Sequence, residues 1–179
     1  MSAPAADKLK VAVPRGALFG ETLDLLDAAG IDTAALRGDS RSLIFDLDGL
    51  TVVTVRPSDV PTYVEAGAAD VGITGKDVLL EQSDRVLYEL LDLGYGRCRM
   101  VLAGRKGDSR LGESQRRLGM ARIATKYPRV TERHFESTGR QVEVIEVKGS
   151  VELAPLVGLG DGIVDLVATG RTLEENGLE

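Results

Sequence analysis

Residues 161–173 hold the side chains best suited to binding an anion. They read Asp-Gly-Ile-Val-Asp-Leu-Val-Ala-Thr-Gly-Arg-Thr-Leu. The β-branched run 163–167 predicts a strand covered on both faces, followed by a helical turn that ends at Gly177. Between them lie two threonines, an arginine and Gly170, which is free to take positive φ. The first amides of a helix lack partners within it, so this loop could hold a phosphate. The alternative is that the loop simply turns a strand into a helix.

A second basic residue follows a strand near the start of the chain. Residues 9–13 predict a strand, Pro14-Arg15-Gly16 a turn, and residues 18–29 a helix that ends at Gly30. Arg15 therefore lies at the carboxyl end of a strand, where open α/β sheets bind ligands. The alternative is a solvated arginine beside a turn.

A short pattern occurs once in each half of the chain. Asp70-Val-Gly-Ile-Thr-Gly-Lys76 and Asp165-Leu-Val-Ala-Thr-Gly-Arg171 share the frame Asp-x-x-x-Thr-Gly-basic, each between a predicted strand and a predicted helix. The frame is not a Walker loop, because Asp70 stands where that motif needs glycine. We interpret the two segments as anion-binding turns that two similar lobes present to one cleft.

The elements that must position these turns alternate between strand and helix. Asp48-Gly49 favours a type I′ hairpin between strands 43–47 and 50–55, although the apolar flanks tolerate other turns. Residues 150–156 predict a short helix, whose Glu152 either complements the helix dipole or accepts hydrogen bonds from ligand hydroxyls. The other predictions are a helix that runs to residue 66, strands at 70–74, 86–93, 99–103, 122–125 and 142–147, a helix at 128–138 and a surface loop at 105–119.

Composition limits the classes of function. With 179 residues, 43% of them hydrophobic, the chain is long enough for a substantial core. Its net charge of −6 argues against nucleic acid as a partner and favours a small ligand held by local groups. One cysteine, Cys98, and one histidine, His134, exclude an intrachain disulfide and a zinc site built on these two residue types. We expect Cys98 in a strand core, no membrane segment, and a cytoplasmic protein.

Several segments together resemble the ATP phosphoribosyltransferase family. They occur in the family's order over nearly the whole chain: Val11-Ala-Val-Pro-Arg-Gly, Ser40-Arg-Ser-Leu-Ile, Asp59-Val-Pro-Thr-Tyr-Val-Glu, Ala69-Asp-Val-Gly-Ile-Thr-Gly-Lys-Asp, Tyr88-Glu-Leu-Leu-Asp-Leu, Ile123-Ala-Thr-Lys-Tyr-Pro, Gly149-Ser-Val-Glu-Leu-Ala-Pro-Leu and residues 161–172. The resemblance implies an α/β, two-lobed type II periplasmic-binding-protein-like fold with a cleft between the lobes. Lobe I would comprise residues 1–94, with 173–179 returning to it, and lobe II residues 95–172 with the phosphoribosyl-phosphate loop.

The resemblance also implies a reaction and a site. N1 of ATP would attack C1 of phosphoribosyl pyrophosphate, giving phosphoribosyl-ATP and pyrophosphate, with Mg²⁺ bound to the substrate pyrophosphate rather than to a protein metal site. Such a reaction needs positive charge near the leaving pyrophosphate and alignment of the two nucleotides. The residues that match the family's catalytic positions are Arg15 and Arg41. Those that match substrate-binding positions are Gly16, Lys76, Glu152, Asp165, Ala168, Thr169, Gly170, Arg171 and Thr172.

Two features depart from the family's pattern. Ala17 stands where many relatives have arginine, and relatives continue past residues 176–178 with strands that return to the first lobe. The chain resembles the short form, so we expect homo-oligomers and a hetero-oligomer with a regulatory subunit similar to histidyl-tRNA synthetase. The alternatives are a two-lobed binding or sensor protein for a phosphorylated small ligand, and a non-catalytic scaffold subunit.

Overall fold

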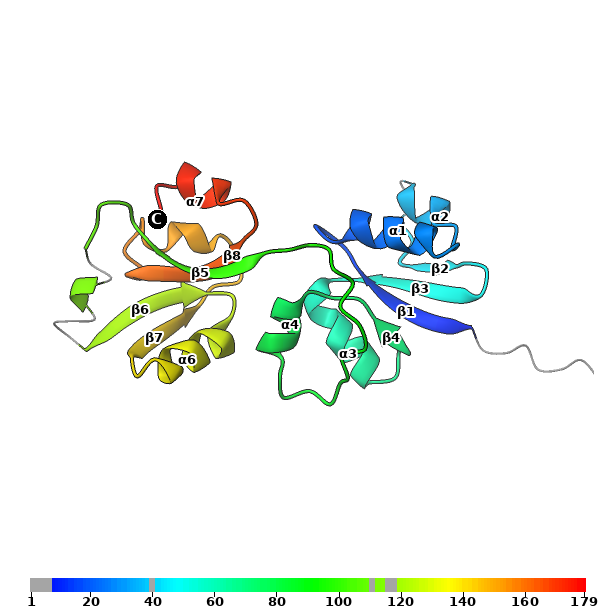
Figure 1. Ribbon diagram of the computed structural model, residues 1–179, viewed down its shortest axis with the longest axis horizontal. Coiled ribbons are helices and arrows are strands. Elements are labelled where there is room, and N and C mark those ends of the chain that lie inside the picture. Colours follow the sequence, from blue (N-terminus) through cyan, green and yellow to red (C-terminus); the bar gives the residue numbers. More distant parts are fainter. Residues whose placement is uncertain (1–7, 39–40, 110–111, 115–118) are drawn as a thin grey trace, which may run out of the picture. The chain divides into compact units, whose positions relative to one another are not determined.

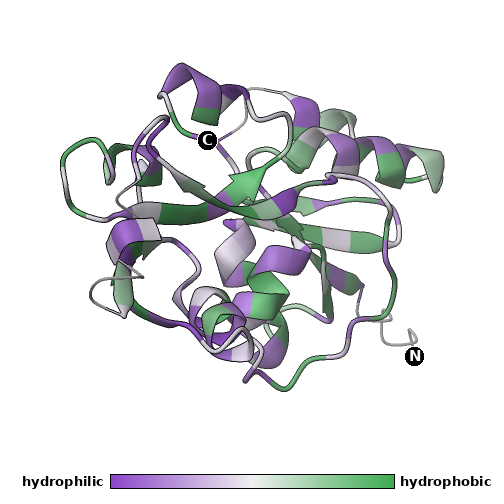
Figure 2. Cartoon of the chain, turned by 60° about the vertical axis from the view of Figure 1, so that its left-hand side comes forward, coloured by the Kyte–Doolittle hydropathy of each residue, from purple (hydrophilic) through white to green (hydrophobic). Residues whose placement is uncertain are grey.

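The computed structural model describes residues 8–38, 41–109, 112–114 and 119–179. The chain divides into two compact units, Met1–Gly96 (unit 1) and Arg97–Glu179 (unit 2), and each contains a four-stranded sheet (Figure 1). Hydrophobic residues concentrate in the strands, whereas hydrophilic residues are frequent on the helices (Figure 2). The division falls two residues after the predicted end of lobe I at residue 94. The predicted surface loop at 105–119 lies partly outside the described residues.

Unit 1 contains a mostly parallel sheet in the order β2-β3-β1-β4. β1 (Leu9–Pro14) is parallel to both β3 (Leu50–Val55) and β4 (Val71–Gly72), whereas β2 (Ile44–Asp46) is antiparallel to β3. The connecting helices are α1 (Phe19–Ala28), α2 (Ala34–Arg37), η1 (Pro57–Asp59) and α3 (Val60–Glu65), and α4 (Lys76–Glu81) follows β4. The parallel strands therefore bring their carboxyl ends to one edge of the sheet.

Successive residues of β1 pack on opposite faces of this sheet. Val11 and Val13 join the cluster that includes α1, whereas Ala12 packs with Val60 of α3. On the α3 face, a Cβ atom on Gly72 would lie 2.4 Å from Cγ1 of Val60. A larger residue at position 72 would thus push α3 away from β4.

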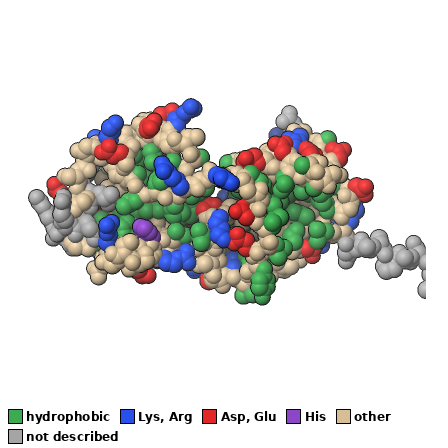
Figure 3. Space-filling view, in the orientation of Figure 1, with side chains coloured by type: hydrophobic (Ala, Val, Ile, Leu, Met, Phe, Trp, Pro, Cys, Tyr) green, Lys and Arg blue, Asp and Glu red, His purple; other side chains and the backbone are tan. Residues whose placement is uncertain are grey.

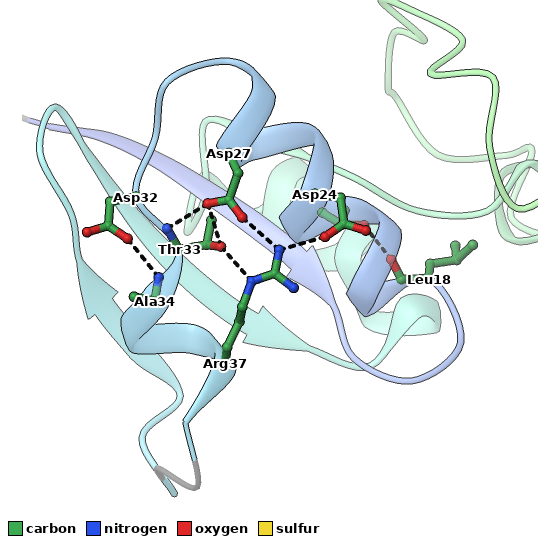
Figure 4. A network of polar contacts seen from close by, with 8 residues as sticks. Leu18, Asp24, Asp27, Asp32, Thr33, Ala34 and Arg37 are labelled. Carbon is green, nitrogen blue, oxygen red and sulfur yellow. Dashed lines mark hydrogen bonds and ion pairs between the residues drawn. The ribbon is translucent and has the colours of Figure 1, made fainter.

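Asp27 ties α1 to α2. Its carboxylate accepts hydrogen bonds from the hydroxyl and the amide of Thr33 at 2.8 and 3.0 Å, and pairs with the Arg37 guanidinium at 2.7 Å (Figure 4). Arg37 also pairs with Asp24 of α1 at 2.7 Å. The Thr33 hydroxyl, followed by Arg37, lowers the pKa of Asp27, and the two aspartates raise the pKa of Arg37. The network thus fixes the end of the helix that begins just after Arg15 and Gly16.

The hairpin between β2 and β3 forms as predicted, but its turn differs. Asp46 pairs with Thr51, and the amide of Leu47 donates to the carbonyl of Leu50. Gly49 has φ 82°, and no residue other than glycine takes positive φ in the described structure. A type I′ turn needs positive φ at both central residues, so the turn is not the favoured type but one of the others that its flanks tolerate. Positive φ at the second position alone is the type II pattern.

Unit 2 contains a sheet in the order β5-β8-β6-β7. β6 (Met120–Thr125) is parallel to β7 (Gln141–Glu146) and to β8 (Gly162–Val167), whereas β5 (Arg99–Gly104) is antiparallel to β8. α6 (Pro128–Ser137) connects β6 to β7, η2 (Val151–Leu153) precedes β8, and α7 (Arg171–Glu175) follows it. β8 is an inner strand with five of its six residues buried, as expected of a strand covered on both faces.

Different elements cover the two faces of the second sheet. Val164 packs with Phe135 of α6 on one face. Ile163 packs with Val151 of η2 on the other, and Leu178 at the end of the chain joins the same cluster. Figure 1 shows α6 on one side of the sheet and α7 on the opposite side. We call the latter the η2/α7 face.

The prediction that residues 173–179 return to lobe I is wrong for this structure. Leu173 and Leu178 pack against the cluster around Ile163, within unit 2. Gly104 of β5 and Glu179 exchange two backbone hydrogen bonds, at 2.8 and 2.9 Å. The apolar side chains of this segment therefore cover the nearest sheet face, which is that of β5 and β8.

Residues 86–93, which were predicted to form a strand, pair with no strand in the described part of the chain. The exposed fraction of Val86, Tyr88, Leu90 and Leu91 lies between 73% and 89%. Hydrophobic side chains are visible on the surface of unit 1 (Figure 3). An apolar run forms a strand only where a neighbouring strand offers hydrogen bonds, and this one finds none. Cys98, predicted in a strand core, is exposed just before β5.

Candidate active site

The corner between β8 and α7 has the backbone geometry that an anion-binding turn requires. We call residues 168–172 the phosphate loop. Gly170 has φ 86° and ψ −10°, and it stands immediately before the first residue of α7. Ala168 and Thr169 are exposed, as are Arg171 and Thr172, and the Thr169 hydroxyl lies 3.5 Å from the Arg171 amide. The predicted positive φ at Gly170 is confirmed, and the first amides of α7 lie in an exposed turn.

Asp165 belongs to β8, the strand that leads into this loop, and lies on the η2/α7 face of the sheet. Side chains alternate along a strand, so Asp165 points to the same face as Ile163. It is only 9% exposed, and its Oδ1 accepts a hydrogen bond from the Leu166 amide at 2.8 Å. Glu152 belongs to η2, which packs on that face, and it is half-buried. The structure thus brings Asp165, η2 and α7 to one side of unit 2.

Arg15 lies at the carboxyl end of β1, as predicted, and its side chain is held in place. Nε donates to the Thr54 hydroxyl of β3 at 3.0 Å, and Nη2 donates to the carbonyl of Ser42 at 3.0 Å. The guanidinium carbon lies 5.9 Å from the centre of the Phe19 ring. Gly16 follows with φ 95°. These contacts orient an exposed cation and leave part of its five-donor fork available to a ligand.

Arg41 reaches the same edge of unit 1 by way of β2. It is exposed and precedes Ser42, whose carbonyl accepts the hydrogen bond from Arg15. Because β2 is antiparallel to β3, the start of β2 lies beside the carboxyl end of β3. The two arginines predicted to be catalytic therefore belong to one local framework.

Lys76, the third basic residue predicted in unit 1, pairs with Glu89. The lysine side chain is 61% exposed and the glutamate side chain is 45% exposed. Asp77 lies in the first turn of α4, and its Oδ1 would be 2.1 Å from a Cβ atom on Gly75. Unlike the phosphate loop, this corner therefore holds a carboxylate directly beside its glycine.

The aspartates in the two copies of the Asp-x-x-x-Thr-Gly-basic frame do not occupy equivalent positions. Asp70 accepts a hydrogen bond from the Lys10 amide at 2.7 Å and donates its own amide to the Lys10 carbonyl at 2.9 Å. Asp161, not Asp165, makes the matching pair of bonds with Arg122, at 2.9 and 2.8 Å. Asp70 immediately precedes β4 and bonds to β1, and Asp161 immediately precedes β8 and bonds to β6. The prediction that each copy of the frame stands at a strand-to-helix junction is nevertheless confirmed, because Gly75 and Gly170 immediately precede α4 and α7.

Sequence reasoning missed one cation at the edge of unit 2. Lys126 follows β6 directly, and its Nζ lies 3.9 Å from Oδ2 of Asp165. The strand register places Thr125 opposite Val164, so Lys126 and Asp165 are the next pair and share the η2/α7 face. Its place after a predicted strand, the criterion applied to Arg15, would have identified it.

Clusters of metal-ligating side chains and membrane-crossing helices were sought among the described residues. No group of three or more His, Cys, Asp and Glu side chains there is placed to hold a metal ion. Among the described helices, none has the length and apolar composition that crossing a membrane requires.

Comparisons with known proteins bear on both sequence and fold. A family model described as HisG: ATP phosphoribosyltransferase matches residues 56–179. An ATP phosphoribosyltransferase from Rubrobacter xylanophilus is 56% identical over 172 residues, covering 96% of this chain and 79% of that protein. One from Ruminiclostridium cellulolyticum is 49% identical over 173 residues, covering 95% and 79%.

Comparison with solved structures agrees with the sequence comparisons. The chain is similar to a structure of the ATP phosphoribosyl transferase (HisG:HisZ) complex from Thermotoga maritima, with a TM-score of 0.78 and 43% identity over 96% of this chain and 80% of that one. An ancestral arginine-binding protein matches with a TM-score of 0.54 and 13% identity, over 96% and 77% of the two chains, and so shares the fold alone. The predicted α/β, type II periplasmic-binding-protein-like fold class is confirmed.

Proposed function

The chain belongs to the ATP phosphoribosyltransferase family, and we propose a role in that family's reaction for the predicted residues of each unit. The enzyme transfers the phosphoribosyl group of phosphoribosyl pyrophosphate to N1 of ATP, the first step of histidine biosynthesis. The N1–C1 bond forms, and the C1–O bond breaks as pyrophosphate leaves with the electron pair. The 56% identity across 96% of the chain carries this conclusion.

The phosphate loop holds the 5-phosphate of phosphoribosyl pyrophosphate in this proposal. Support comes from Gly170, whose positive φ turns the backbone into the first turn of α7. Amides at such a turn, with the Thr169 and Thr172 hydroxyls and Arg171, are suited to phosphate oxygens. Asp165 and Glu152 then lie on the side of the sheet where ribose hydroxyls need acceptors.

Arg15 and Arg41 stabilise the charge that develops on the leaving pyrophosphate. Arg15 is held by two hydrogen bonds and an aromatic ring, so little reorganisation is needed when the charge appears. Many relatives have an arginine where this chain has Ala17. Arg15 therefore supplies the positive charge at the turn that follows β1. Lys76 can add charge only by leaving Glu89, and an exposed ion pair of that kind is worth about 0–1 kcal/mol.

Mg²⁺ enters bound to the pyrophosphate oxygens in this proposal. Magnesium prefers oxygen ligands and usually retains several waters when it binds with substrate phosphates. The protein then binds the magnesium-bound pyrophosphate through arginine side chains and main-chain amides.

The assembly and location are also proposed. The related Thermotoga maritima structure is a HisG:HisZ complex. We expect this chain to form homo-oligomers and to bind a regulatory subunit similar to histidyl-tRNA synthetase, in the cytoplasm. Sedimentation of the chain with and without such a subunit tests this, because a single species unchanged by the subunit would contradict it.

A direct assay tests the activity. Purified protein is mixed with ATP, phosphoribosyl pyrophosphate and Mg²⁺, and the absorbance of phosphoribosyl-ATP is followed. Product should form, stop on chelation of Mg²⁺ and resume when the ion is restored. Binding of both nucleotides without turnover would instead support the scaffold alternative.

A further inference from the structure

We propose that Lys126 is a further substrate-binding residue, which contacts the 5-phosphate of phosphoribosyl pyrophosphate beside the phosphate loop. The inference rests on the proposed function of that loop and adds a residue from a different strand. It is carried by the position of Lys126 at the carboxyl end of β6, next to β8.

Lys126 lies on the correct side of the sheet. Its backbone is abreast of Asp165, and both side chains point to the η2/α7 face. α7, which begins within the phosphate loop, packs on this same face through Leu173. A phosphate held at the first turn of α7 would therefore lie on the same side of the sheet as the Lys126 side chain.

The reach of the side chain fits this position. A strand rises about 3.3 Å per residue, so Ala168 lies on the order of 10 Å beyond Asp165 along the chain. The four-carbon stem of Lys126 and a hydrogen bond of about 2.9 Å together span most of that distance. The ammonium therefore needs only to swing along β8 to reach a phosphate oxygen.

The contact of Lys126 with Asp165 leaves this movement open. The separation of 3.9 Å is too long for a hydrogen bond, and the lysine side chain is 38% exposed. Asp165 is buried and negative, so without a nearby cation it would repel a bound phosphate. Lys126 thus offsets the carboxylate before the substrate arrives and binds the phosphate afterwards.

The chain offers a matched control. Lys148 follows β7 at the same edge, and its Nζ lies 3.7 Å from Oε1 of Glu146, but it is 88% exposed and one strand farther from β8. Lys126→Gln and Lys148→Gln therefore remove the same charge from pairs of similar length. Only the former change lies next to the strand that carries the phosphate loop.

Steady-state kinetics and calorimetry with ribose 5-phosphate test the proposal. A charge-assisted hydrogen bond corresponds to about ten- to a hundredfold in affinity, so Lys126→Gln should raise KM for phosphoribosyl pyrophosphate by that factor. Because the 5-phosphate keeps its charge through the reaction, kcat and KM for ATP should stay within about twofold. Ribose 5-phosphate, which lacks the pyrophosphate, should lose affinity equally.

Several outcomes would overturn the inference. They are an unchanged KM in Lys126→Gln, a loss confined to kcat, and an equal loss in Lys148→Gln. Lys126→Arg, which keeps the charge, should retain most of the affinity, and thermal melts of all variants separate binding loss from unfolding. If wild-type protein turns over while Lys126→Gln behaves normally, the inference fails and the proposed function stands.

Discussion

Replacing Gly170 by alanine tests whether the backbone conformation of the phosphate loop is what binds the substrate. Gly170 has φ 86°, and a Cβ atom there would meet only Cγ1 of Val167, at 4.0 Å. The added methyl group is therefore accommodated, and the cost is conformational. A residue other than glycine pays about 1–2 kcal/mol to hold the left-handed conformation.

That cost can appear in stability or in binding. If the corner keeps its shape in Gly170→Ala, the free energy of unfolding falls by the full amount and affinity is unchanged. If the exposed loop relaxes in the free enzyme, the substrate must restore the shape, and affinity falls by up to the same amount. A penalty of about 1–2 kcal/mol corresponds to a loss of about 5- to 30-fold.

We expect the second outcome, because α7 has five residues and its amino-terminal corner is exposed. Gly139 provides the control. It has φ 68°, follows α6 in the same unit, and a Cβ atom there meets nothing within 4 Å. Gly139→Ala therefore carries a similar conformational cost, at a position that the proposed function does not use.

Calorimetric titration with phosphoribosyl pyrophosphate and thermal melts measure the two effects. Gly170→Ala should lose affinity, whereas Gly139→Ala should lose only stability. Wild-type affinity together with wild-type stability in Gly170→Ala would refute the reasoning, because the cost of the left-handed conformation would then appear in neither measurement. Equal losses of affinity in both variants would show a general loss of folding instead.

Two further changes probe the first unit. Arg41→Ala should lower kcat by about ten- to a hundredfold with a smaller change in KM, because charge grows on the leaving pyrophosphate; unchanged turnover in steady-state assays would remove Arg41 from the catalytic residues. Asp27→Asn should destabilise the protein at pH 7 but progressively less as the pH falls. The lowered pKa of Asp27 means that its contribution is present above the unfolded value, about 3.9, and disappears as the pH falls through the folded value. Urea unfolding at several pH values checks this, and a difference that grew in acid would contradict it.

Elements with a strong internal pattern could be predicted from the sequence. β1 and α1, and the succession β6, α6 and β7, lie within about two residues of the predicted ranges, because buried positions recur along each of them. The corner between β8 and α7 could be predicted from Gly170, which stands between a buried strand and a helical turn. In each case the information lies within a short stretch of chain.

Features that depend on distant partners could not be predicted in the same way. The run at 86–93 is as apolar as a strand, but pairing depends on a free neighbouring edge. Lys126 lies 39 positions from Asp165 in the sequence, and only the register of β6 against β8 brings them together. The packing of Leu178 depends likewise on the uncovered face of β5 and β8.

In the repeated frame the two glycines are equivalent, because each immediately precedes a helix, but the two aspartates are not. Asp70 and Asp161 are the equivalent aspartates of the two units. Their carboxylates accept hydrogen bonds from the amides of Lys10 in β1 and Arg122 in β6. Counted from these, β8 continues through Asp165 to Val167, whereas β4 ends at Gly72. The Gly75 corner is therefore reached four residues earlier along its strand than the Gly170 corner.

This difference in register changes the argument for Lys76. Its role cannot be inferred from likeness to Arg171, so it depends on the local charges alone. Glu89 and Asp77 both lie at that corner, and an anion must compete with them. Because Lys76 and Glu89 are both exposed, their ion pair is weak enough for a pyrophosphate to displace. Lys76 therefore fits a cation recruited by substrate, in contrast to Arg15, whose hydrogen bonds hold it in place before substrate binds.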